Sequence, residues 1–467
     1  MEGLVTSRWL AVSFMLGSAC LGCGDEFERA PDNQGGAGPA GPGAGGGSST
    51  GTGTGGAGAS AGGAGSGAAG SGGSETGGAG GGCEPGLGDC DGDASNGCET
   101  DTTNDAANCG ACSTKCHTEC VTSICDDPVQ VSGSNYFTCA VRALGDLYCW
   151  GNNTTGALGD GGTTDSYIPK KVPLPSPAKE VATGRPYGLH ACALLENGEL
   201  YCWGNSSSGE VGIGSTGTHV LPSKVDLPDV LQISAGVNHT CAVTTQNDLY
   251  CWGSDVYGEL GLAGNMQYTV PVFVLGGVAH VAAGNYHTCA LKQGGEVLCW
   301  GNNSDEEVIE TPTTIPLGAA ATALSAGGGH DCATLVDGSL WCWGRNDDGQ
   351  LGDGSTASST AATLAVASDV TRAGLGYGHS VALKTDQTLY AWGYGDHGEL
   401  GLGTGVAATT PQPVPMVNGV TALGIGAYHS CVIRNDGALL CWGWNQAGQL
   451  GDGTTVDNPV PTAVMWP

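Results

Sequence analysis

The stretch Gly236-Val-Asn-His239-Thr-Cys241-Ala-Val-Thr-Thr-Gln-Asn-Asp248-Leu-Tyr-Cys251-Trp252-Gly253 decides the fold, because most of the chain after residue 128 repeats it. Seven copies align in register, and the sixth has Val381 and Ala391 where the others have cysteines. Because both cysteines are lost together, the pattern predicts one disulfide in each of the other six copies. The expected pairs are Cys139 with Cys149, Cys192 with Cys202, Cys241 with Cys251, Cys289 with Cys299, Cys332 with Cys342, and Cys431 with Cys441.

Each copy has the pattern of two strands joined by a short turn. In Cys192-Ala-Leu-Leu-Glu196-Asn-Gly198-Glu-Leu-Tyr-Cys202, apolar residues alternate on both sides of Glu-Asn-Gly, and the glycine is available for a positive backbone angle. The two cysteines then lie opposite each other, close enough for a disulfide. A repeat of 43 to 53 residues with about four short strands is typical of a propeller blade. Residues 128–467 are therefore predicted to form an all-β, seven-bladed β-propeller.

The two ends of the repeat region predict how the ring closes. Pro461-Thr-Ala-Val464-Met-Trp-Pro467 has its counterpart in Pro169-Lys-Lys-Val172-Pro-Leu-Pro175. The continuation after Pro175, Val181-Ala-Thr-Gly184, matches Val129-Gln-Val-Ser-Gly133 at the start of the repeats. We therefore expect the last strand to complete the blade that the first strand begins, which would remove a free sheet edge.

The copies resemble those of the regulator of chromosome condensation repeat family. The resemblance rests on the glycine and histidine of Gly236-Val-Asn-His239, the Asp-Gly or Asn-Gly turn, the Trp-Gly pair, and the motif Gly349-Gln-Leu-Gly352. Two copies depart: the first has Phe137 in place of histidine, and the fourth has Asn302-Asn-Ser-Asp-Glu-Glu-Val-Ile-Glu310 in place of the last motif. The family's best-known member exchanges nucleotide on a small nuclear GTPase and binds chromatin, whereas other seven-bladed relatives are secreted binders, including an inhibitor of β-lactamase. The matching residues are scaffold, so the resemblance implies the fold and does not choose an activity.

An export signal and a tether are predicted ahead of the repeats. Residues 1–23 have Arg8, a short apolar run and then Gly17-Ser-Ala-Cys20-Leu-Gly-Cys23, which resembles a bacterial lipobox. Cys20 has the better small-residue context, whereas lipidation of Cys23 leaves an even number of cysteines to pair. We expect an exported lipoprotein of the cell surface or outer membrane, with plain secretion or an uncleaved signal as the alternatives. Residues 24–82, mostly Gly, Ala, Ser and Thr, are predicted to be a disordered tether.

Residues 83–127 form a predicted cysteine-rich module. Eight cysteines after an export signal predict four disulfides of undetermined connectivity: Cys83, Cys90, Cys98, Cys109, Cys112, Cys116, Cys120 and Cys125. Zinc is the alternative, because Cys109-x2-Cys112 and Cys116-His117 have ligand-like spacing. A calcium loop at Asp89, Asp91 and Asp93 is weighed against a solvated acidic turn, since the glycine and glutamate of an EF-hand are out of place. No other metal or cofactor is expected.

The charge of the chain limits its partners. The sequence has 45 acidic and 14 basic residues, a formal net charge of −31. Nucleic-acid binding needs clustered Lys and Arg, so we expect no nucleic-acid partner. The same acidity argues against adhesion to anionic lipid headgroups, which leaves a lipid anchor as the membrane attachment. The propeller is expected to be a monomer.

The sequence offers little catalytic chemistry. It contains no His-Glu-x-x-His, no P-loop, and no Gly-x-Ser-x-Gly placed between a strand and a helix. One histidine recurs at the same position of six copies, which favours a scaffold residue hydrogen-bonded within each blade over a metal ligand or catalytic group. These histidines are His190, His239, His287, His330, His379 and His429. The tryptophans of the Trp-Gly pairs are expected to pack between blades.

One predicted face of the ring carries aromatic residues that the repeated scaffold positions do not explain. If the strands alternate in direction, the loop before each histidine and the loop after each Trp-Gly emerge together. The first set carries Tyr136, Tyr187, Tyr286, Tyr377 and Tyr428, and the second carries Tyr257, Tyr394 and Trp444. Aromatic anchors among polar residues are typical of protein interfaces, and sugar-binding surfaces use aromatic faces too. The alternative is that some of these tyrosines fold back onto their own blades.

These features favour a surface-tethered, non-catalytic propeller that binds an unidentified protein at the cell surface. One alternative is an extracellular glycan-binding or glycan-cleaving propeller enzyme. Cleavage would need paired carboxylates, and only Asp305, Glu306 and Glu307 of the fourth copy hint at them. The other alternative is a structural protein of the cell envelope.

Overall fold

The computed structural model describes residues 87–88, 100–101, 104, 107, 115–121, 124–185, 188–264, 266–303 and 308–467. The chain divides into two compact units, Met1–Gly77 and Gly78–Pro467, and the described residues all belong to the second. Cys20, Cys23 and the calcium candidates Asp89, Asp91 and Asp93 lie outside the described residues, as does most of residues 1–114. The described part of the chain contains no helix that is long and apolar enough to cross a bilayer.

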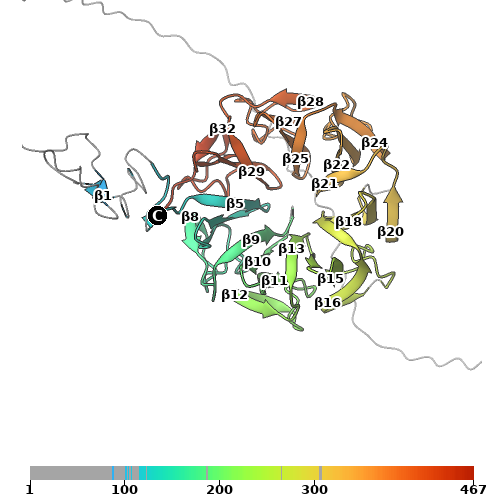
Figure 1. The fold of residues 1–467 in the computed structure, drawn as a ribbon, viewed down its shortest axis with the longest axis horizontal. Coiled ribbons are helices and arrows are strands. Elements are labelled where there is room, and N and C mark those ends of the chain that lie inside the picture. Colours follow the sequence, from blue (N-terminus) through green and yellow to red (C-terminus); the bar gives the residue numbers. More distant parts are fainter. Residues whose placement is uncertain are drawn as a thin grey trace, which may run out of the picture. The chain divides into compact units, whose positions relative to one another are not determined.

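Seven four-stranded antiparallel sheets form a ring, which confirms the predicted seven-bladed propeller (Figure 1). In every blade the four strands are consecutive in the sequence and pair in order. The first strands lie side by side around the axis: β5 (Pro128–Gly133), β9 (Ala178–Thr183), β13 (Val230–Ala235), β17 (Val278–Ala283), β21 (Ala321–Ala326), β25 (Val370–Leu375) and β29 (Val420–Ile425). The second strands follow: β6 (Phe137–Arg142), β10 (His190–Leu195), β14 (His239–Thr244), β18 (Tyr286–Lys292), β22 (His330–Leu335), β26 (His379–Lys384) and β30 (His429–Arg434).

The outer half of each blade consists of the third and fourth strands. The third strands carry the Trp-Gly pairs: β7 (Leu147–Gly151), β11 (Leu200–Ser206), β15 (Asp248–Ser254), β19 (Val297–Asn302), β23 (Leu340–Gly344), β27 (Leu389–Gly393) and β31 (Leu439–Gly443). The fourth strands form the rim: β8 (Ser166–Lys171), β12 (Gly217–Val225), β16 (Gln267–Gly276), β20 (Ile309–Ile315), β24 (Ser359–Val366), β28 (Ala408–Pro413) and β32 (Asn458–Ala463). Burial falls from the second strands, which are almost wholly buried, to the largely exposed fourth strands, because only the inner strands are covered by blades on both faces.

The predicted hairpin is present between β10 and β11. Cys192 lies opposite Cys202 in the strand register. At the turn, Gly198 has a φ of 81°, as predicted, and its N–H donates to Leu195 O at 2.9 Å. The glycine after tryptophan is required for another reason. A Cβ on Gly253 would lie 2.3 Å from Asn238 O, so no side chain fits between these two strands.

All six predicted hairpin disulfides are formed, with Cα atoms 4.0–4.1 Å apart. In the sixth blade Val381 lies opposite Ala391 at the equivalent register, and both are buried. The joint loss of two cysteines in that copy therefore reflects one missing cross-strand pair.

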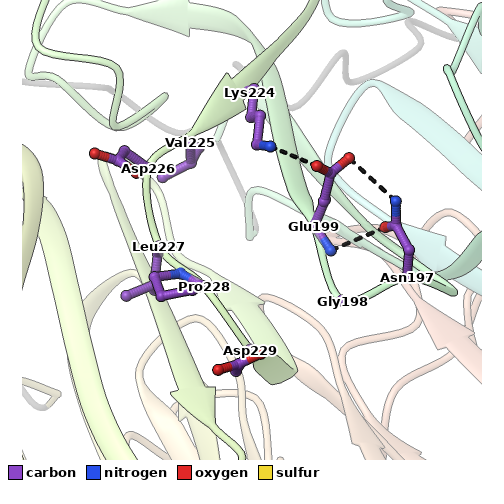
Figure 2. Close-up of a pocket in the computed structure, with 9 residues that line it drawn as sticks. All are labelled: Asn197, Gly198, Glu199, Lys224, Val225, Asp226, Leu227, Pro228 and Asp229. Carbon is purple, nitrogen blue, oxygen red and sulfur yellow. Dashed lines mark hydrogen bonds and ion pairs between the residues drawn. The ribbon is translucent and has the colours of Figure 1, made fainter.

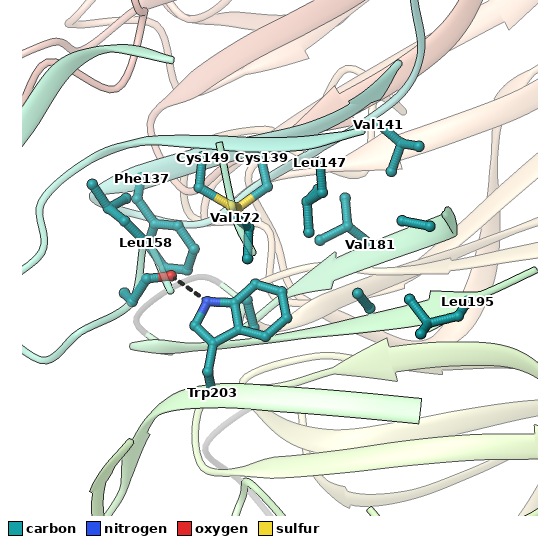
Figure 3. Packing of buried hydrophobic residues seen from close by; sticks show 14 residues of the cluster. Phe137, Cys139, Val141, Leu147, Cys149, Leu158, Val172, Val181, Leu195 and Trp203 are labelled. Carbon is teal, nitrogen blue, oxygen red and sulfur yellow. Dashed lines mark hydrogen bonds between the residues drawn. A yellow bond between two sulfur atoms is a disulfide. The ribbon is translucent and has the colours of Figure 1, made fainter. Parts of the chain in front are cut away.

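Neighbouring blades are held together by packing of each tryptophan into the preceding blade. Figure 3 shows Trp203 of the second blade beneath the Cys139–Cys149 disulfide of the first, with Phe137 and Leu158 beside it. The Trp203 indole is fully buried and its Nε1–H donates to Ala157 O at 2.9 Å. The prediction that these tryptophans pack between blades is confirmed.

The predicted exchange of strands at the ring closure is wrong. The first blade is β5–β8 and the last is β29–β32, so each blade is built from one contiguous segment. The ring closes through side chains instead, since the Trp150 Nε1–H of the first blade donates to Gln449 O of the last at 2.9 Å. The tail after β32 then reaches the first blade, where the Trp466 ring contacts those of Tyr148 and Trp150 at 5.5 and 6.1 Å. The sequence likeness that suggested exchange marks two equivalent fourth strands, β8 and β32.

The cysteine-rich module contributes two short pairs of strands, β1 (Leu87–Gly88) with β2 (Thr100–Asp101) and β3 (Cys120–Val121) with β4 (Ile124–Cys125). Cys116 forms a disulfide with Cys125, and Cys120 is also disulfide-bonded. The zinc alternative is therefore wrong for Cys116, because a sulfur held in a disulfide is not a thiolate ligand.

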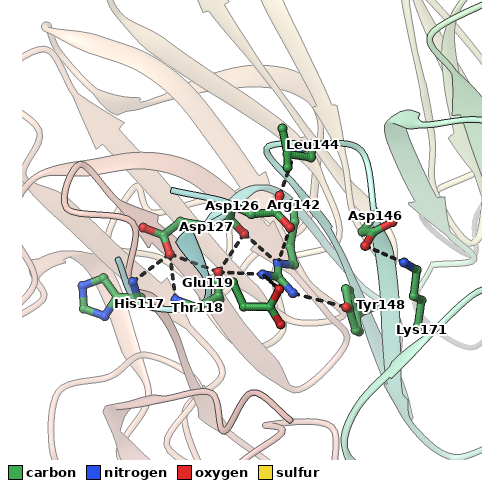
Figure 4. A network of polar contacts seen from close by, with 10 residues as sticks. All are labelled: His117, Thr118, Glu119, Asp126, Asp127, Arg142, Leu144, Asp146, Tyr148 and Lys171. Atoms are coloured by element: carbon green, nitrogen blue, oxygen red, sulfur yellow. Dashed lines mark hydrogen bonds and ion pairs between the residues drawn. The ribbon is translucent and has the colours of Figure 1, made fainter. Parts of the chain in front are cut away.

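A buried arginine joins this module to the first blade (Figure 4). The Arg142 Nε lies 3.1 Å from the Asp126 carboxylate, and its other nitrogens donate to Tyr148 Oη at 3.2 Å and Thr118 Oγ1 at 3.0 Å. Asp126 in turn accepts from Leu144 N at 2.7 Å, and both charged side chains are almost fully buried. The segment that precedes β5 is thus fixed to the ring by a paired, hydrogen-bonded charge.

Candidate functional site

Five of the eight aromatic residues predicted from the sequence meet at one end of the ring. At three successive interfaces, the residue after Trp-Gly contacts a tyrosine of the next blade: Arg345 with Tyr377 at 5.4 Å from guanidinium carbon to ring centroid, Tyr394 with Tyr428 at 5.9 Å, and Trp444 with Tyr136 at 5.5 Å between centroids. The pairs also contact each other, since Tyr428 lies 5.5 Å from Tyr377 and 6.0 Å from Trp444. We call this set, with His397, the aromatic arc.

Backbone register explains why these side chains meet. The N–H groups of Arg345, Tyr394 and Trp444 donate at 2.8 Å to carbonyls in the loop that precedes the histidine of their own blade. Each side chain therefore leaves the sheet at the same height and leans toward the next blade. All members of the arc are partly exposed, so the alternative in which they fold into their own blades does not describe them.

The other predicted face residues are placed separately. Tyr257 and Tyr286 form a pair of their own, with ring centroids 4.8 Å apart. Tyr187 lies outside the described residues, as do Asp305, Glu306 and Glu307. The sequence pattern assigned both tyrosines to one face and did not distinguish this pair from the arc.

Carboxylates surround the arc. Asp347 accepts from Arg345 Nε at 2.8 Å, and Asp457 lies 3.3 Å from His397 Nδ1. A Cβ built on Gly378 would lie 3.0 Å from an Asp348 oxygen and 3.2 Å from Tyr394 Cβ, which places that aspartate beside the ring. Burial raises the pKa of Tyr394, and the carboxylates of Asp396, Glu399 and Asp348 raise it further. The arc is therefore an aromatic surface in a negative field.

The recurring histidines hold neighbouring blades together. Each Nε2 bonds to the residue after the next blade's histidine position, which corrects the predicted bonding within a blade. The pairs are His190 with Thr240 (2.9 Å), His239 with Thr288 (2.9 Å), His287 with Asp331 (2.8 Å), His330 with Ser380 (2.8 Å), His379 with Ser430 (3.0 Å) and His429 with Thr138 (2.8 Å). They are scaffold residues, as predicted, but they act between blades.

The interface that closes the ring shows the full arrangement. Thr138 Oγ1 donates to Gln449 O at 2.8 Å, so it accepts from the Nε2–H of His429, which fixes that tautomer. Burial lowers the pKa of His429 to about 3, and its side chain is fully buried. A neutral, buried imidazole whose N–H is already committed is not placed to act as a base on an external substrate.

The two departures from the repeat alter this arrangement. Phe137 replaces the first histidine and packs in one cluster with Ala191, which stands where Thr138 stands in the first blade. In the fourth copy, His287 bonds to Asp331, which also accepts from Asn303 Nδ2 at 3.3 Å. In the described part of the chain the buried Trp343 Nε1–H has no acceptor, since the fourth copy lacks the motif whose carbonyl serves elsewhere.

One group of side chains has metal-like spacing within the described ranges. Sulfurs of Cys289 and Cys299 and an oxygen of Asp331 lie within 4.8 Å of one another and are buried. Both sulfurs belong to one disulfide, so they are not thiolate ligands. The group is part of the interface between the fourth and fifth blades.

A shallow depression lies at the opposite end of the strands, by the β10–β11 turn (Figure 2). Lys224 is paired with Glu199, which also accepts from Asn197 Nδ2 at 3.2 Å. The side chains of Asp226 and Asp229 point away from Glu199. The depression therefore does not bring two carboxylates together as glycoside cleavage would require.

Two sequence models of the regulator of chromosome condensation (RCC1) repeat match the chain. One matches residues 129–157, 230–259, 278–306, 321–350, 370–399 and 420–449, and the other 145–189, 197–243, 246–291, 337–383, 386–433 and 436–467. These segments cover more than half of the sequence. The chain belongs to the RCC1 repeat family.

Individual relatives match over shorter lengths. The ultraviolet-B receptor UVR8 of Arabidopsis thaliana is 34% identical over 98 residues, 21% of this chain and 22% of the relative. The mitochondrial RCC1 domain-containing protein RUG3 of the same plant is 30% identical over 99 residues, again 21% and 22%. The matched region thus spans about a fifth of the length of each of these curated relatives.

Two solved structures share the fold. Yeast RCC1 (Prp20), crystallised with Kap60, has a TM-score of 0.62 at 23% identity and covers 68% of this chain and 83% of that chain. Human WBSCR16 has a TM-score of 0.62 at 22% identity, covering 69% and 94%.

Within the RCC1 repeats of this chain, the arc stands where the copies diverge. The position after Trp-Gly is small and polar in the first four blades, with Asn152, Asn205, Ser254 and Asn302, and becomes Arg345, Tyr394 and Trp444 in the last three. Scaffold positions repeat around a ring, whereas a surface that binds one partner does not need to. This divergence was visible in the sequence and is the signal that separates the arc from the Tyr257–Tyr286 pair.

Proposed function

We propose that this chain is a non-catalytic protein-binding propeller, held at the cell surface by its N-terminal segment, and that the aromatic arc captures the partner. The observation that carries the proposal is the continuity of the arc. Five aromatic rings and a histidine from the last two blades and the first touch one another and remain partly exposed. Aromatic side chains supply large contact areas at low entropic cost, and hot spots of protein interfaces are enriched in tyrosine, tryptophan and arginine.

Other features support parts of this proposal. Prp20p of Saccharomyces cerevisiae, a propeller of this fold, is described with binding to Gsp1p and histones, so the fold accommodates protein partners. Six hairpin disulfides favour an oxidising compartment outside the cytosol. The apolar segment ahead of Cys20 and Cys23 and the Gly-rich residues 24–82 supply an anchor and a tether. The proposed protein acts as a monomer and uses no cofactor.

The test compares two variants of the oxidised full-length chain. Tyr428→Ala with Trp444→Ala removes the centre of the arc, and Val336→Ala removes an exposed side chain, 64% accessible, from a turn at the opposite end. Each is used to capture surface and secreted proteins from cells that produce the chain. Saturable capture of one protein that is lost only in the arc variant supports the proposal. Capture of a glycan, or of a protein by both variants equally, would contradict it, provided both variants melt within a few degrees of the parent.

A further inference from the structure

Within the aromatic arc, one guanidinium, that of Arg345, already lies over an aromatic ring. Its carbon lies 5.4 Å from the centroid of the Tyr377 ring, Nη1 donates to Tyr377 Oη at 3.0 Å, and Nε donates to Asp347 at 2.8 Å. The cation thus sits on an aromatic face while a carboxylate holds its edge. This combination is the chemistry by which proteins recognise arginine.

The next two interfaces repeat the aromatic part of this arrangement without an arginine, and the first of them also repeats the acidic part, whereas Gln446 stands at the acidic position of the second. Where Arg345 stands in the fifth blade, Tyr394 and Trp444 stand in the sixth and seventh, facing Tyr428 and Tyr136. Asp396 lies two residues after Tyr394, as Asp347 lies two residues after Arg345, and Asp396 is exposed.

The charges at the arc are unbalanced. Asp347, Asp348, Asp396 and Asp457 lie beside the arc, whereas the described cations near it are Arg345 and Arg185, which donates to Leu375 O at 3.2 Å, two residues before Tyr377. The whole chain has a formal net charge of −31, so the excess of carboxylates at the arc has the same sign as the charge of the chain. A ligand that complements the surface is therefore positive and has a flat face to stack on aromatic rings.

We infer that the aromatic arc recognises a partner segment that presents arginine side chains, which stack on Tyr428, Tyr394 and Trp444 while Asp396 accepts their N–H groups. The inference rests on the proposed function and names its ligand chemistry. Arginine is favoured over lysine because its planar guanidinium stacks on rings and donates in a fork, as Arg345 does on Tyr377 and Asp347. Nearby rim carboxylates would speed the encounter, which makes the association rate dependent on salt.

The experiment uses peptides as probes of the oxidised full-length chain. Three labelled hexapeptides alternate glycine with arginine, with citrulline or with lysine, and their binding is followed by fluorescence anisotropy in about 150 mM salt. Citrulline keeps the shape of arginine and removes its charge, so the citrulline peptide is expected to bind about tenfold more weakly than the arginine peptide. The lysine peptide is expected to bind several-fold more weakly, since it lacks the planar fork.

Variants locate the binding. Asp396→Asn is expected to weaken the arginine peptide about threefold to tenfold. Asp226→Asn is the matched control, since it removes one exposed aspartate at the opposite end of the strands. Tyr428→Leu removes a stacking face and is expected to weaken the arginine peptide without changing the citrulline peptide. Equal weakening by Asp396→Asn and Asp226→Asn would show only general charge attraction and would overturn the inference, as would a lysine peptide that binds as well as arginine.

The outcomes separate this inference from the proposed function. If the arginine peptide does not bind while the arc variant still loses its captured protein, the ligand chemistry is wrong and the protein-binding function stands. If neither the peptide nor a protein depends on the arc, both proposals fail.

Discussion

The interface that closes the ring provides the sharpest test of how the blades are held together. It joins the first and last blades without a linking peptide, and its centre is the bond from His429 Nε2–H to Thr138 Oγ1, which itself donates to Gln449 O. Replacement of Thr138 with alanine leaves the buried His429 donor without an acceptor, which costs about 1–3 kcal/mol. The lost hydroxyl and methyl contacts add about 1 kcal/mol. We therefore expect Thr138→Ala to lower the free energy of unfolding by about 2–4 kcal/mol.

The interface between the first and second blades shows which pair of residues should restore the stability lost in Thr138→Ala. There Phe137 and Ala191 occupy the places of His429 and Thr138, both fully buried and without a polar group to satisfy. His429→Phe alone should also destabilise the protein, because the larger ring meets Thr138. The double variant His429→Phe with Thr138→Ala should be more stable than the sum of the single effects predicts, by at least about 1 kcal/mol.

Urea unfolding of the oxidised chain, followed by tryptophan fluorescence, measures all four members of this cycle. The parent and the double variant should unfold in one transition, and the two single variants at lower urea. Additive effects, within about 0.5 kcal/mol, would refute the reasoning that the histidine and the hydroxyl form one unit.

Four further predictions concern other parts of the chain. Burial raises the pKa of Glu399 to about 8, so the stability that its protonated carboxyl gives the folded chain is fully present below pH 4.5 and is lost as pH rises through 8. Glu399→Gln should therefore raise the melting temperature at pH 8.5 and leave it unchanged at pH 4. Gln350→Glu, at the equivalent position of the fifth blade, should lower the melting temperature at pH 8.5. Val381→Cys with Ala391→Cys should form a seventh hairpin disulfide, detected by non-reducing mass spectrometry, because these residues share the register of the other pairs; two free thiols would contradict this register. Arg142→Met should destabilise the chain by about 3–5 kcal/mol in urea unfolding and expose residues 116–127 to proteases, because it leaves Asp126 buried without its cation. Unchanged protease resistance would argue that the Arg142–Asp126 ion pair does not hold this segment on the first blade. If the lipid is on Cys20, Cys20→Ser should abolish incorporation of labelled palmitate while Cys23→Ser does not, and the reverse should hold for Cys23; labelling that survives both substitutions would remove the proposed anchor.

The sequence was sufficient for the architecture because each blade repeats the same local rules. The cysteine spacing, the turn glycine at Gly198 and the Trp-Gly pair all depend on pairing within one hairpin, and all three appear as predicted. The closure of the ring was predicted wrongly because a repeat unit can be cut at any point without changing the pattern. Only the pairing of β32 with β31, and not with β5, decides where the blade ends.

The site was predicted in part for a similar reason. Strand direction places the loops before histidine and after Trp-Gly together, so the contact of Trp444 with Tyr136 follows from the pattern. The partner of each histidine did not follow, because Thr138 and His429 lie 291 residues apart and meet only when the ring closes. The carboxylates beside Tyr394 likewise depend on the relative height of neighbouring blades.

Photo-crosslinking from within the arc tests the central claim most directly. A benzophenone amino acid replaces Tyr428 in one chain and Val336, at the opposite end, in another, and both chains are displayed by the cells that normally make the protein. We predict that the probe at 428 crosslinks to one protein through a segment that contains arginine, and that the probe at 336 does not. Crosslinks that form only at 336, or equally at both positions, would contradict the account.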